Sequence, residues 1–153
     1  MENRRRSFMK TMNNTGRILA LDFGSSRIGL ALSDELRITA QPYGTLERSV
    51  LEEEIRRIEE IVSREGVVEI VVGLPKRQDG SLGEMAQAAK SFADAIRQAL
   101  AITVRMWDER YSSHAAERIL LEGNLRRAKR KKVVDQTAAA WILQGYLDSR
   151  AAR

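Results

Sequence analysis

Two short apolar segments near the start of the chain are joined by only three residues. Residues 17–23 form a nearly continuous apolar run, and residues 27–33 alternate large apolar side chains with glycine and alanine. Both patterns are typical of β-strands, and the Gly-Ser-Ser link at residues 24–26 predicts a tight turn. Two strands with so short a link pair antiparallel, because a parallel pair needs a long crossover. The fold must therefore begin with an antiparallel hairpin.

Beyond this hairpin, strand and helix patterns alternate along the chain. Residues 38–46 predict a third strand, in which Pro42 favours an edge position because proline cannot donate a ladder hydrogen bond. Apolar residues at helical spacing predict a helix over residues 49–64, with Ser49 as its N-cap and Gly66 as its stop signal. The other predicted elements are a strand at 67–72, a helix at 85–100, a strand at 102–107 and helices at 112–121 and 134–147.

This order of elements predicts an α/β fold. Strands that are separated by helices pair in parallel, whereas the closely spaced opening strands pair antiparallel. We therefore expect a mixed five-stranded sheet, with its first three strands antiparallel, flanked by helices. The 153 residues suit a single domain. We place this domain at residues 17–150, after a disordered basic tail at residues 1–16.

Two residue types that carry much enzyme chemistry are scarce. The chain has no cysteine and one histidine, His114. Disulfides and thiolate nucleophiles are therefore excluded, and a Ser-His-Asp triad or a histidine-rich metal site is disfavoured. No apolar run approaches the ~18 residues that cross a bilayer, and residues 1–16 hold no apolar stretch of the kind found in secretory signals. We expect a cytoplasmic protein with no membrane association.

Three acidic residues stand at the ends of predicted elements. Asp22 follows a buried-strand pattern, Glu109 comes just after the strand at 102–107, and Asp135 opens the last helix. A carboxylate in such a setting is costly unless a cation pairs with it. If the strands that begin at residues 17 and 102 lie side by side, their carboxyl ends present Asp22 and Glu109 together. The last helix would then bring Asp135 beside them.

Three carboxylates in one place predict a metal site. They repel one another, and some stay protonated, unless a divalent cation neutralises them. Mg²⁺ is the natural candidate because it prefers oxygen ligands, and Mn²⁺ is the alternative. Two such ions can hold both the attacking water and the leaving oxygen of a phosphodiester. The small residues Ala138 and Ala139 let the last helix approach the sheet closely.

Each acid also has a purely structural interpretation. Asp22 could cap the turn that follows it. Glu109 could pair with Arg105 or Arg110 at the surface. Asp135 could be an ordinary helix N-cap, a position that favours aspartate. Any one of the acids alone is a weak indication, and the set of three is more specific.

Positive charge gathers just before Asp135. The net charge of the chain is +5, and a local basic patch attracts polyanions by counterion release. We interpret the patch as a basic loop that contacts nucleic acid; a solvated charged loop is the alternative. Its members are Arg126, Arg127, Lys129, Arg130, Lys131 and Lys132.

Two further segments could meet a substrate. Ser112 and Ser113 could donate to a phosphate through their hydroxyls or through a helix N-terminus, or they could simply cap that helix. Gly73 and Gly80 bound a segment in which the backbone could approach a substrate closely, although an ordinary strand-to-helix turn has the same composition.

Taken together, these sequence segments resemble those of the YqgF-like family. Its members are described as Holliday junction resolvases of the ribonuclease H-like superfold, and also as nucleases that process the small-subunit ribosomal RNA precursor. The resemblance covers about residues 17–147. The matching stretches are Leu-Asp-Phe-Gly at 21–24, Arg-Ile-Gly-Leu-Ala at 27–31, Ser-Asp at 33–34, Gly-Leu-Pro at 73–75 with Gly80, Asp-Glu-Arg-Tyr-Ser-Ser at 108–113 with Ala116, and Lys132 with Asp135, Ala138 and Ala139.

The resemblance implies a ribonuclease H-like fold and a magnesium-dependent nuclease, with Asp22, Glu109 and Asp135 as metal ligands and catalytic residues. Its implied task is processing of the 5′ end of the pre-16S ribosomal RNA in ribosome biogenesis. The alternatives are a Holliday junction resolvase that cuts branched DNA and a non-catalytic RNA-binding assembly factor. The expected partner is nucleic acid, and the expected state is a monomer or weak homodimer. Many nucleases of this superfold carry a fourth acid, for which Asp34 and Asp108 are the candidates.

Overall fold

The computed structural model describes residues 15–75, 79, 82–109 and 127–151, and for residues 127–137 and 151 it describes the backbone alone. Five strands form one sheet in the order β3-β2-β1-β4-β5. In chain order, the elements are β1 (Arg17–Phe23), β2 (Arg27–Ser33), β3 (Ala40–Glu47), α2 (Leu51–Glu65), β4 (Val67–Leu74), α3 (Glu84–Leu100), β5 (Thr103–Asp108) and α5 (Arg127–Ala151).

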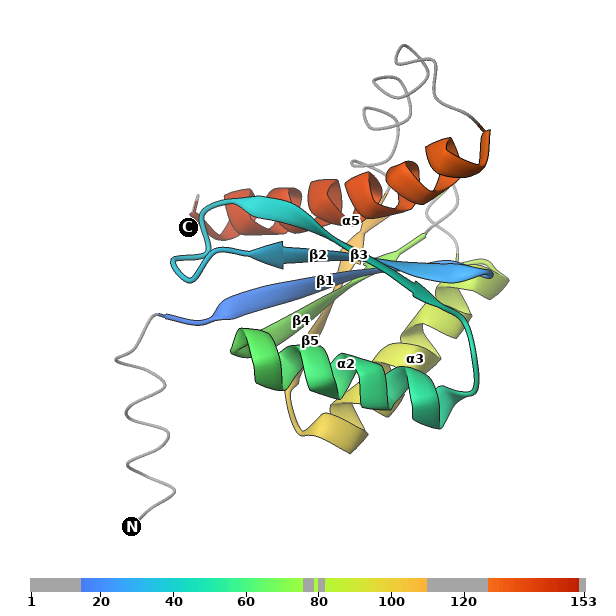
Figure 1. Cartoon of the computed structure of the whole chain (residues 1–153), viewed down its shortest axis with the longest axis horizontal. Helices are drawn as coiled ribbons and strands as arrows, with labels where there is room; N and C mark the ends of the chain where they lie inside the picture. The colour runs from blue at the N-terminus through green and yellow to red at the C-terminus, as the bar shows by residue number, and fades with distance from the viewer. Residues whose placement is uncertain (1–14, 76–78, 80–81, 110–126, 152–153) are drawn as a thin grey trace.

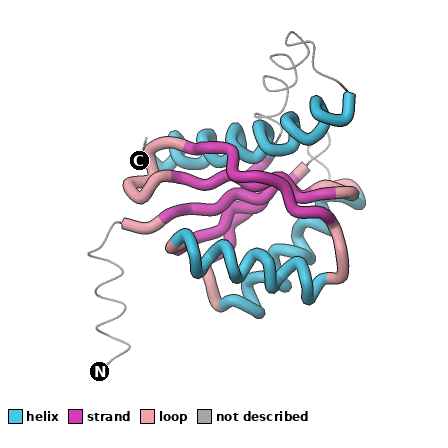
Figure 2. The backbone as a smooth tube through the Cα atoms, viewed as in Figure 1, coloured by secondary structure: helices cyan, strands magenta, loops and turns pink. Residues whose placement is uncertain are grey.

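The described part of the molecule has three layers. Helices α2 and α3 cover one face of the sheet, and α5 covers the other (Figure 1). β1 pairs antiparallel with β2, and β2 pairs antiparallel with β3. β4 pairs in parallel with β1 and with β5, and the twisted sheet that results runs through the middle of the molecule (Figure 2). The predicted mixed sheet with three antiparallel strands at its beginning is confirmed.

One expectation about the sheet is wrong: β1 and β5 are not neighbours, because β4 lies between them. All but one of the residues of β4 are buried. An interior parallel strand with both faces covered by helices needs such an apolar sequence. The two acids that we expected on adjacent strands therefore start from positions two strands apart.

The side chains of β1 divide between two apolar clusters. Leu19, Leu21 and Phe23 pack with α2 and α3. Ile18 and Ala20 pack with α5. Since successive side chains of a strand point to opposite faces, Asp22 lies on the α5 face. That alternation places the first acid beneath the helix that carries Asp135.

The edge strand β3 contains Pro42, as predicted. The pairing register with β2 shifts at this point: Leu30 is opposite Gly44, but Ala31 is opposite Pro42. Tyr43 is thus an extra residue in the edge strand, as in a β-bulge. Proline has no backbone N–H to donate. In an edge strand it therefore removes no hydrogen bond from the interior of the sheet.

The start of α2 differs from the prediction. Its N-cap is Val50, with no side-chain cap hydrogen bond, so Ser49 is not the cap. The backbone N–H of Ser49 instead donates to the buried carboxylate of Glu54, at 3.2 Å. The end of α2 is as predicted, because Gly66 adopts the left-handed conformation (φ 66°) that ends many helices.

Helix α5 begins at Arg127, seven residues earlier than predicted. Arg127 and residues 129–132 are therefore helical, and the prediction of a basic loop there is wrong. Arginine, lysine and alanine are good helix formers, and no glycine or proline interrupts the segment. Arg126 and the helix predicted at 112–121 lie outside the described residues, as does most of the tail predicted at 1–16. Among the described residues, no helix is long and apolar enough to span a membrane.

Candidate metal site at the carboxyl ends of the parallel strands

Asp22 and Glu109 meet at the carboxyl ends of the parallel strands. Asp22 is the second-last residue of β1, opposite Gly29 of β2. Glu109 follows the last residue of β5 directly. The carboxyl groups of Glu109 and Asp22 are joined by a hydrogen bond. The sequence prediction that these two acids come together is confirmed, although their strands are not adjacent.

Gly73 makes this contact possible. It is a β4 residue between the two acids, and a β-carbon on it would lie 2.6 Å from Oε1 and 2.9 Å from Cγ of Glu109. Such distances are far below ordinary carbon contacts. The side chain of Glu109 therefore crosses β4 through the space that a larger residue would fill. From the sequence we expected Gly73 in a loop near the substrate, whereas the structure places it inside the strand as the gap between the acids.

The environment of Glu109 favours its neutral form. Burial, and then the hydrogen bond and charge of Asp22 with the charge of Asp108, raise the pKa of Glu109 to about 10 from 4.5. Two nearby carboxyls of which one keeps its proton are a known consequence of like charges at short range. A divalent cation would neutralise the same pair in place of that proton. The donor set therefore fits a hard cation such as Mg²⁺.

Asp135, the third predicted ligand, lies in α5. Its side chain is outside the described part of the structure. Among the side chains that are described, no group of three or more acidic or histidine residues could hold a metal ion. The helix itself packs as expected, with Ala139 and Ile142 buried against the sheet. Ile142 also reaches Gly73, because a β-carbon there would lie 2.7 Å from its Cδ1.

The two candidates for a fourth acid differ. The carboxylate of Asp34 accepts hydrogen bonds from the backbone N–H groups of Thr39 (2.9 Å) and Ile38 (2.7 Å), which lower the pKa of Asp34. It follows Ser33, at the end of β2 remote from Asp22. Asp34 therefore belongs to the β2–β3 turn. Asp108 lies next to Glu109 and helps to raise its pKa, so it stays a candidate.

The structural interpretation of Glu109 was a surface ion pair with Arg105 or Arg110, and of these two arginines the structure describes Arg105. Arg105 donates to Glu69 at 3.0 Å, and Glu69 also accepts from Arg150 at 2.7 Å and from the hydroxyl of Tyr146 at 2.9 Å. Arg105 thus pairs with a different carboxylate, the buried one of Glu69. Arg110, the other proposed partner, is outside the described residues.

The predicted nucleic-acid contacts stay predictions. Ser112, Ser113 and Arg126 lie outside the described residues. Arg127 and residues 129–132 form the first turns of α5, but the structure describes their backbone alone. Position 129 and its neighbours thus share a helix with position 135. That placement keeps the basic residues on the same element as the third predicted ligand.

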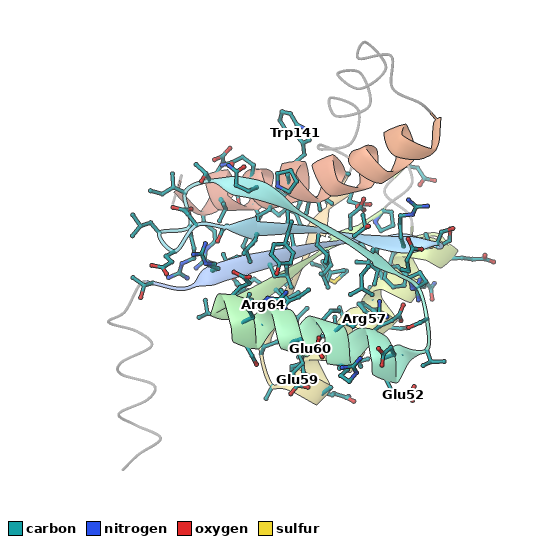
Figure 3. The ribbon with its side chains drawn as sticks, in the orientation of Figure 1. Glu52, Arg57, Glu59, Glu60, Arg64 and Trp141 are labelled. Atoms are coloured by element: carbon teal, nitrogen blue, oxygen red, sulfur yellow. The ribbon has the colours of Figure 1, made fainter. Side chains whose placement is uncertain are left out.

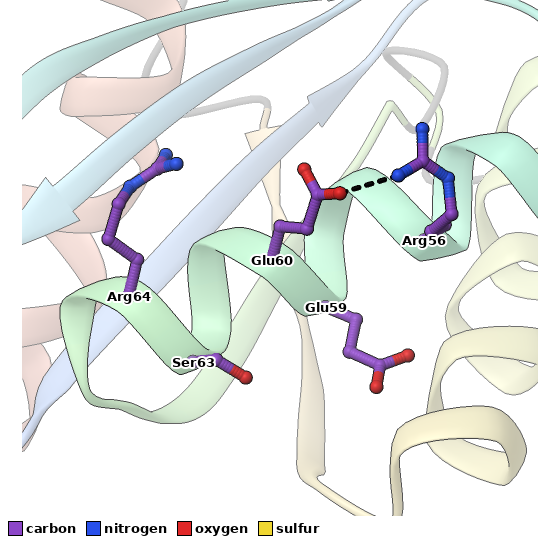
Figure 4. Close-up of a pocket in the computed structure, with 5 residues that line it drawn as sticks. All are labelled: Arg56, Glu59, Glu60, Ser63 and Arg64. Carbon is purple, nitrogen blue, oxygen red and sulfur yellow. Dashed lines mark hydrogen bonds and ion pairs between the residues drawn. The ribbon is translucent and has the colours of Figure 1, made fainter.

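Two other surface features are separate from the paired acids. A hollow of about 510 Å³ lies on α2 and is lined by Arg56, Glu59, Glu60, Ser63 and Arg64 (Figure 4). Arg56 pairs there with Glu60, and α2 covers the face of the sheet opposite to Asp22. Trp141 points away from the sheet on the outer side of α5, with 39% of its surface exposed (Figure 3). Neither feature adds a ligand to the acids.

Comparisons with known proteins identify the family of the chain. A family described as "RuvX: Holliday junction resolvase" matches residues 16–149. A protein of Symbiobacterium thermophilum named "Putative pre-16S rRNA nuclease" is 48% identical over 137 residues, which cover 90% of this chain and 95% of that protein. A protein of Clostridium tetani with the same name is 48% identical over 133 residues, covering 87% and 96% of the two chains.

Solved structures with the same fold include two resolvases. RuvC of T. thermophilus in complex with a Holliday junction substrate has a TM-score of 0.57 at 15% identity, covering 90% of this chain and 96% of that one. The yeast mitochondrial Holliday junction resolvase Ydc2 has a TM-score of 0.57 at 11% identity, covering 90% and 80%. At such low identity these matches establish the fold alone. The predicted ribonuclease H-like fold is confirmed.

Proposed function

The chain belongs to the RuvX family of resolvase-like nucleases, and from this premise we propose that it cleaves phosphodiester bonds in the precursor of 16S ribosomal RNA with a divalent cation held by Asp22 and Glu109. The observation that carries the proposal is the contact between these two carboxyls across Gly73. The named relatives at 48% identity favour the ribosomal RNA precursor as the substrate. A cytoplasmic location, in keeping with the absence of cysteine, is part of the proposal.

Each acid has a role in this proposal. Asp22 extends from the end of β1 and Glu109 from the end of β5, so the pair can hold a cation from two sides. Such a cation, which we take to be Mg²⁺ or Mn²⁺, would activate water and stabilise the leaving oxygen. Glu109 would release its proton to become a ligand, because only the ionised carboxylate binds a cation well.

Asp135 is proposed as the third ligand from the direction of α5. Tyr146 and Arg150 contact Glu69 near the start of β4, whereas Ile142 reaches Gly73 near its end. Helix α5 therefore runs opposite to β4, and position 135 lies two turns further toward the carboxyl ends of the parallel strands. Seven residues also return to nearly the same helix face. This placement supports a role beside Asp22 and Glu109.

The test is a cleavage panel with purified protein. The substrates are a precursor RNA with the 5′ leader of 16S ribosomal RNA, single-stranded DNA and a four-way DNA junction, each with Mg²⁺, Mn²⁺ or a chelator. We expect cleavage of the RNA that depends on the metal. Asp22→Asn should abolish cleavage and leave RNA binding largely intact. Asp34→Asn is the matched control. Asp34 accepts hydrogen bonds within the β2–β3 turn, so this variant should keep wild-type activity.

The description of the matching family supports one alternative, resolution of Holliday junctions. Symmetric cutting of a four-way junction requires two active sites, so this alternative predicts a dimer. Preferential cleavage of the junction in the same panel would select it over the ribosomal RNA precursor. A wild-type protein that binds RNA but yields no metal-dependent product would instead be a non-catalytic assembly factor.

A further inference from the structure

We propose that Arg48 and Glu54 are positioning residues that hold Asp22 in place from the opposite face of the sheet. The inference rests on the proposed function, because it treats Asp22 as a ligand of the catalytic cation. Both residues lie on the α2 side of the molecule, away from the paired acids. Arg48 lies in the segment that joins β3 to α2, and Glu54 lies in the first turn of α2.

Glu54 is the starting point because its carboxylate is almost fully buried. The residue stands in the first turn of α2 with 1% of its surface exposed. A buried carboxylate is strongly unfavourable unless it is paired and hydrogen-bonded. Nε of Arg48 supplies the charge partner at 2.6 Å, and the backbone N–H of Ser49 donates at 3.2 Å. Glu54 thereby fixes the position of the Arg48 guanidinium.

The guanidinium of Arg48 also contacts the two residues that follow Asp22. Its Nη1 donates to the carbonyl oxygen of Gly24 at 2.8 Å. Its Cζ lies 4.3 Å from the centre of the Phe23 ring, a distance at which cation–π attraction operates. The backbone N–H of Arg48 also donates to the carbonyl of Ser26 at 3.1 Å. A single side chain therefore connects α2 with the end of β1.

Phe23 is fixed from its other side as well. Its ring centre lies 5.0 Å from that of Phe92 in α3, with the planes tilted by 41°. Phe23 and Asp22 are consecutive residues of a strand, so their side chains point to opposite faces. Any rotation of the strand that moved Phe23 on one face would move Asp22 on the other.

The end of β1 is paired with β2 on one side only. The last paired residues of β1 and β4 are Leu21 and Val72, so the ladder with β4 stops just before Asp22. Beyond Phe23, the chain turns through Gly24, whose N–H donates to the carbonyl of Arg27 at 3.1 Å. Arg48 holds both sides of this turn. Groups that orient a metal ligand in this way typically change metal affinity about 10- to 100-fold when they are removed.

The chain offers a matched control for a merely structural effect. Glu69 is another buried carboxylate, with 6% exposure, and it also binds arginine, at 3.0 Å (Arg105) and 2.7 Å (Arg150). It lies near the start of β4, at the opposite end of that strand from Gly73. Loss of its charge should destabilise the fold without disturbing the paired acids.

The experiment titrates the full-length protein with Mn²⁺ alone, by calorimetry, and measures thermal unfolding of each variant. The variants are Glu54→Gln, Arg48→Met, the milder Arg48→Lys and the control Glu69→Gln. We expect Arg48→Met and Glu54→Gln to weaken Mn²⁺ binding about tenfold, and the control to keep wild-type affinity while its stability falls. In cleavage assays, the metal concentration for half-maximal rate should rise, with a smaller loss of rate at saturating metal.

The proposal is overturned if the Arg48 and Glu54 variants bind Mn²⁺ as tightly as the wild type, or if Glu69→Gln weakens binding equally. If Arg48→Met does not fold, Arg48→Lys decides, because it keeps the charge but lacks the planar fork that reaches Glu54 and Gly24 together. Failure of the proposed function looks different: the wild type itself binds no Mn²⁺, or Asp22→Asn binds it normally. Either of these results removes the cation site and the positioning role together.

Discussion

Oε1 of Glu109 lies 2.6 Å from the point that a β-carbon on Gly73 would occupy. A glycine in β4, the strand between β1 and β5, is thus the condition under which an acid from β5 meets an acid from β1. The strand between them would otherwise separate the two carboxyls. The site depends on the absence of a side chain as much as on the acids themselves.

The first prediction follows from this relationship. Gly73→Ala should push Glu109 and Ile142 aside, because the new methyl group would lie 2.6 Å and 2.7 Å from their nearest atoms. Overpacking of this kind destabilises by about 1–3 kcal/mol, and a displaced Glu109 should reduce metal-dependent cleavage strongly. Chemical denaturation and a cleavage assay measure the two effects.

The control for this substitution is Gly145→Ala in α5. A β-carbon there would meet Trp107 no closer than 3.4 Å, which is close to an ordinary contact. Replacing glycine by alanine inside a helix stabilises by up to about 1 kcal/mol, so this variant should keep both fold and activity. A fully active Gly73→Ala protein would mean that Glu109 does not need to cross β4.

The second prediction concerns pH and the metal-free protein. With its pKa raised to about 10, Glu109 keeps its proton in the native state at pH values where the unfolded chain has released it. The native state then binds more protons, so the free energy of unfolding falls as the pH rises from about 4.5 toward 10. Glu109→Gln, which resembles the protonated carboxyl, should remove this decline and be more stable than the wild type in mildly alkaline buffer.

Denaturant titrations with a chelator across this pH range provide the measurement. Asp34→Asn is an informative comparison, because hydrogen bonds lower the pKa of Asp34. Its contribution to stability is present above the unfolded-state pKa and is lost as the pH falls. Glu109→Gln should therefore change the free energy of unfolding on the alkaline side of the pH profile, and Asp34→Asn should change it on the acidic side. An unchanged alkaline limb in Glu109→Gln would mean that Glu109 is ionised in the native protein.

The third prediction tests the basic residues at and before the start of α5. Neutralising Arg126, Arg127, Lys129 and Arg130 together should weaken RNA binding and flatten the slope of log affinity against log salt. The slope should change by about 0.7–0.9 for each phosphate group that the variant no longer neutralises. Binding titrations over a range of salt concentrations measure it.

A control for net charge removes arginines that the structure places elsewhere. Arg56, Arg57 and Arg64 lie on α2, on the other side of the sheet, and Arg97 lies on α3. Neutralising these four removes the same formal charge and should leave the salt slope near that of the wild type. Equal slopes in the two quadruple variants would mean that net charge, and no particular surface, attracts the RNA.

The fourth prediction concerns the attachment of α5. The hydroxyl of Tyr146 donates to the buried carboxylate of Glu69 at 2.9 Å. Tyr146→Phe should reduce stability by about 1 kcal/mol, since Glu69 keeps its two arginines and loses one hydrogen bond. Cleavage at saturating metal should be unchanged, because this contact lies far along β4 from Gly73.

Tyr43→Phe is the comparison, because Tyr43 donates to Glu65 at 3.1 Å in a less buried place. The decrease in stability should be smaller there, since water can replace a partly exposed hydrogen bond more readily than a buried one. Thermal unfolding of both variants measures the difference. A decrease at Tyr43 equal to that at Tyr146 would contradict the assigned importance of the hydrogen bonds around Glu69.

The sequence by itself determined the elements whose signals are local. The bounds of β1 and β2 agree with their apolar periodicity to the residue, the edge position of β3 follows from Pro42, and Gly66 ends α2. The acids Asp22 and Glu109 were also recognisable, because each follows directly on a strand pattern. These features depend on neighbouring residues along the chain. Apolar periodicity and turn-forming residues are therefore enough to predict them.

Only the tertiary structure decided which strands are neighbours and how the acids meet. β1, β4 and β5 have similar apolar patterns, and nothing local states that β4 lies between the other two. The role of Gly73 as the gap for Glu109, and of Arg48 as a link between Glu54 and the turn after Asp22, arises from contacts between distant segments. Such contacts follow from the packing of whole elements against one another, and a local pattern specifies only which face of an element is apolar.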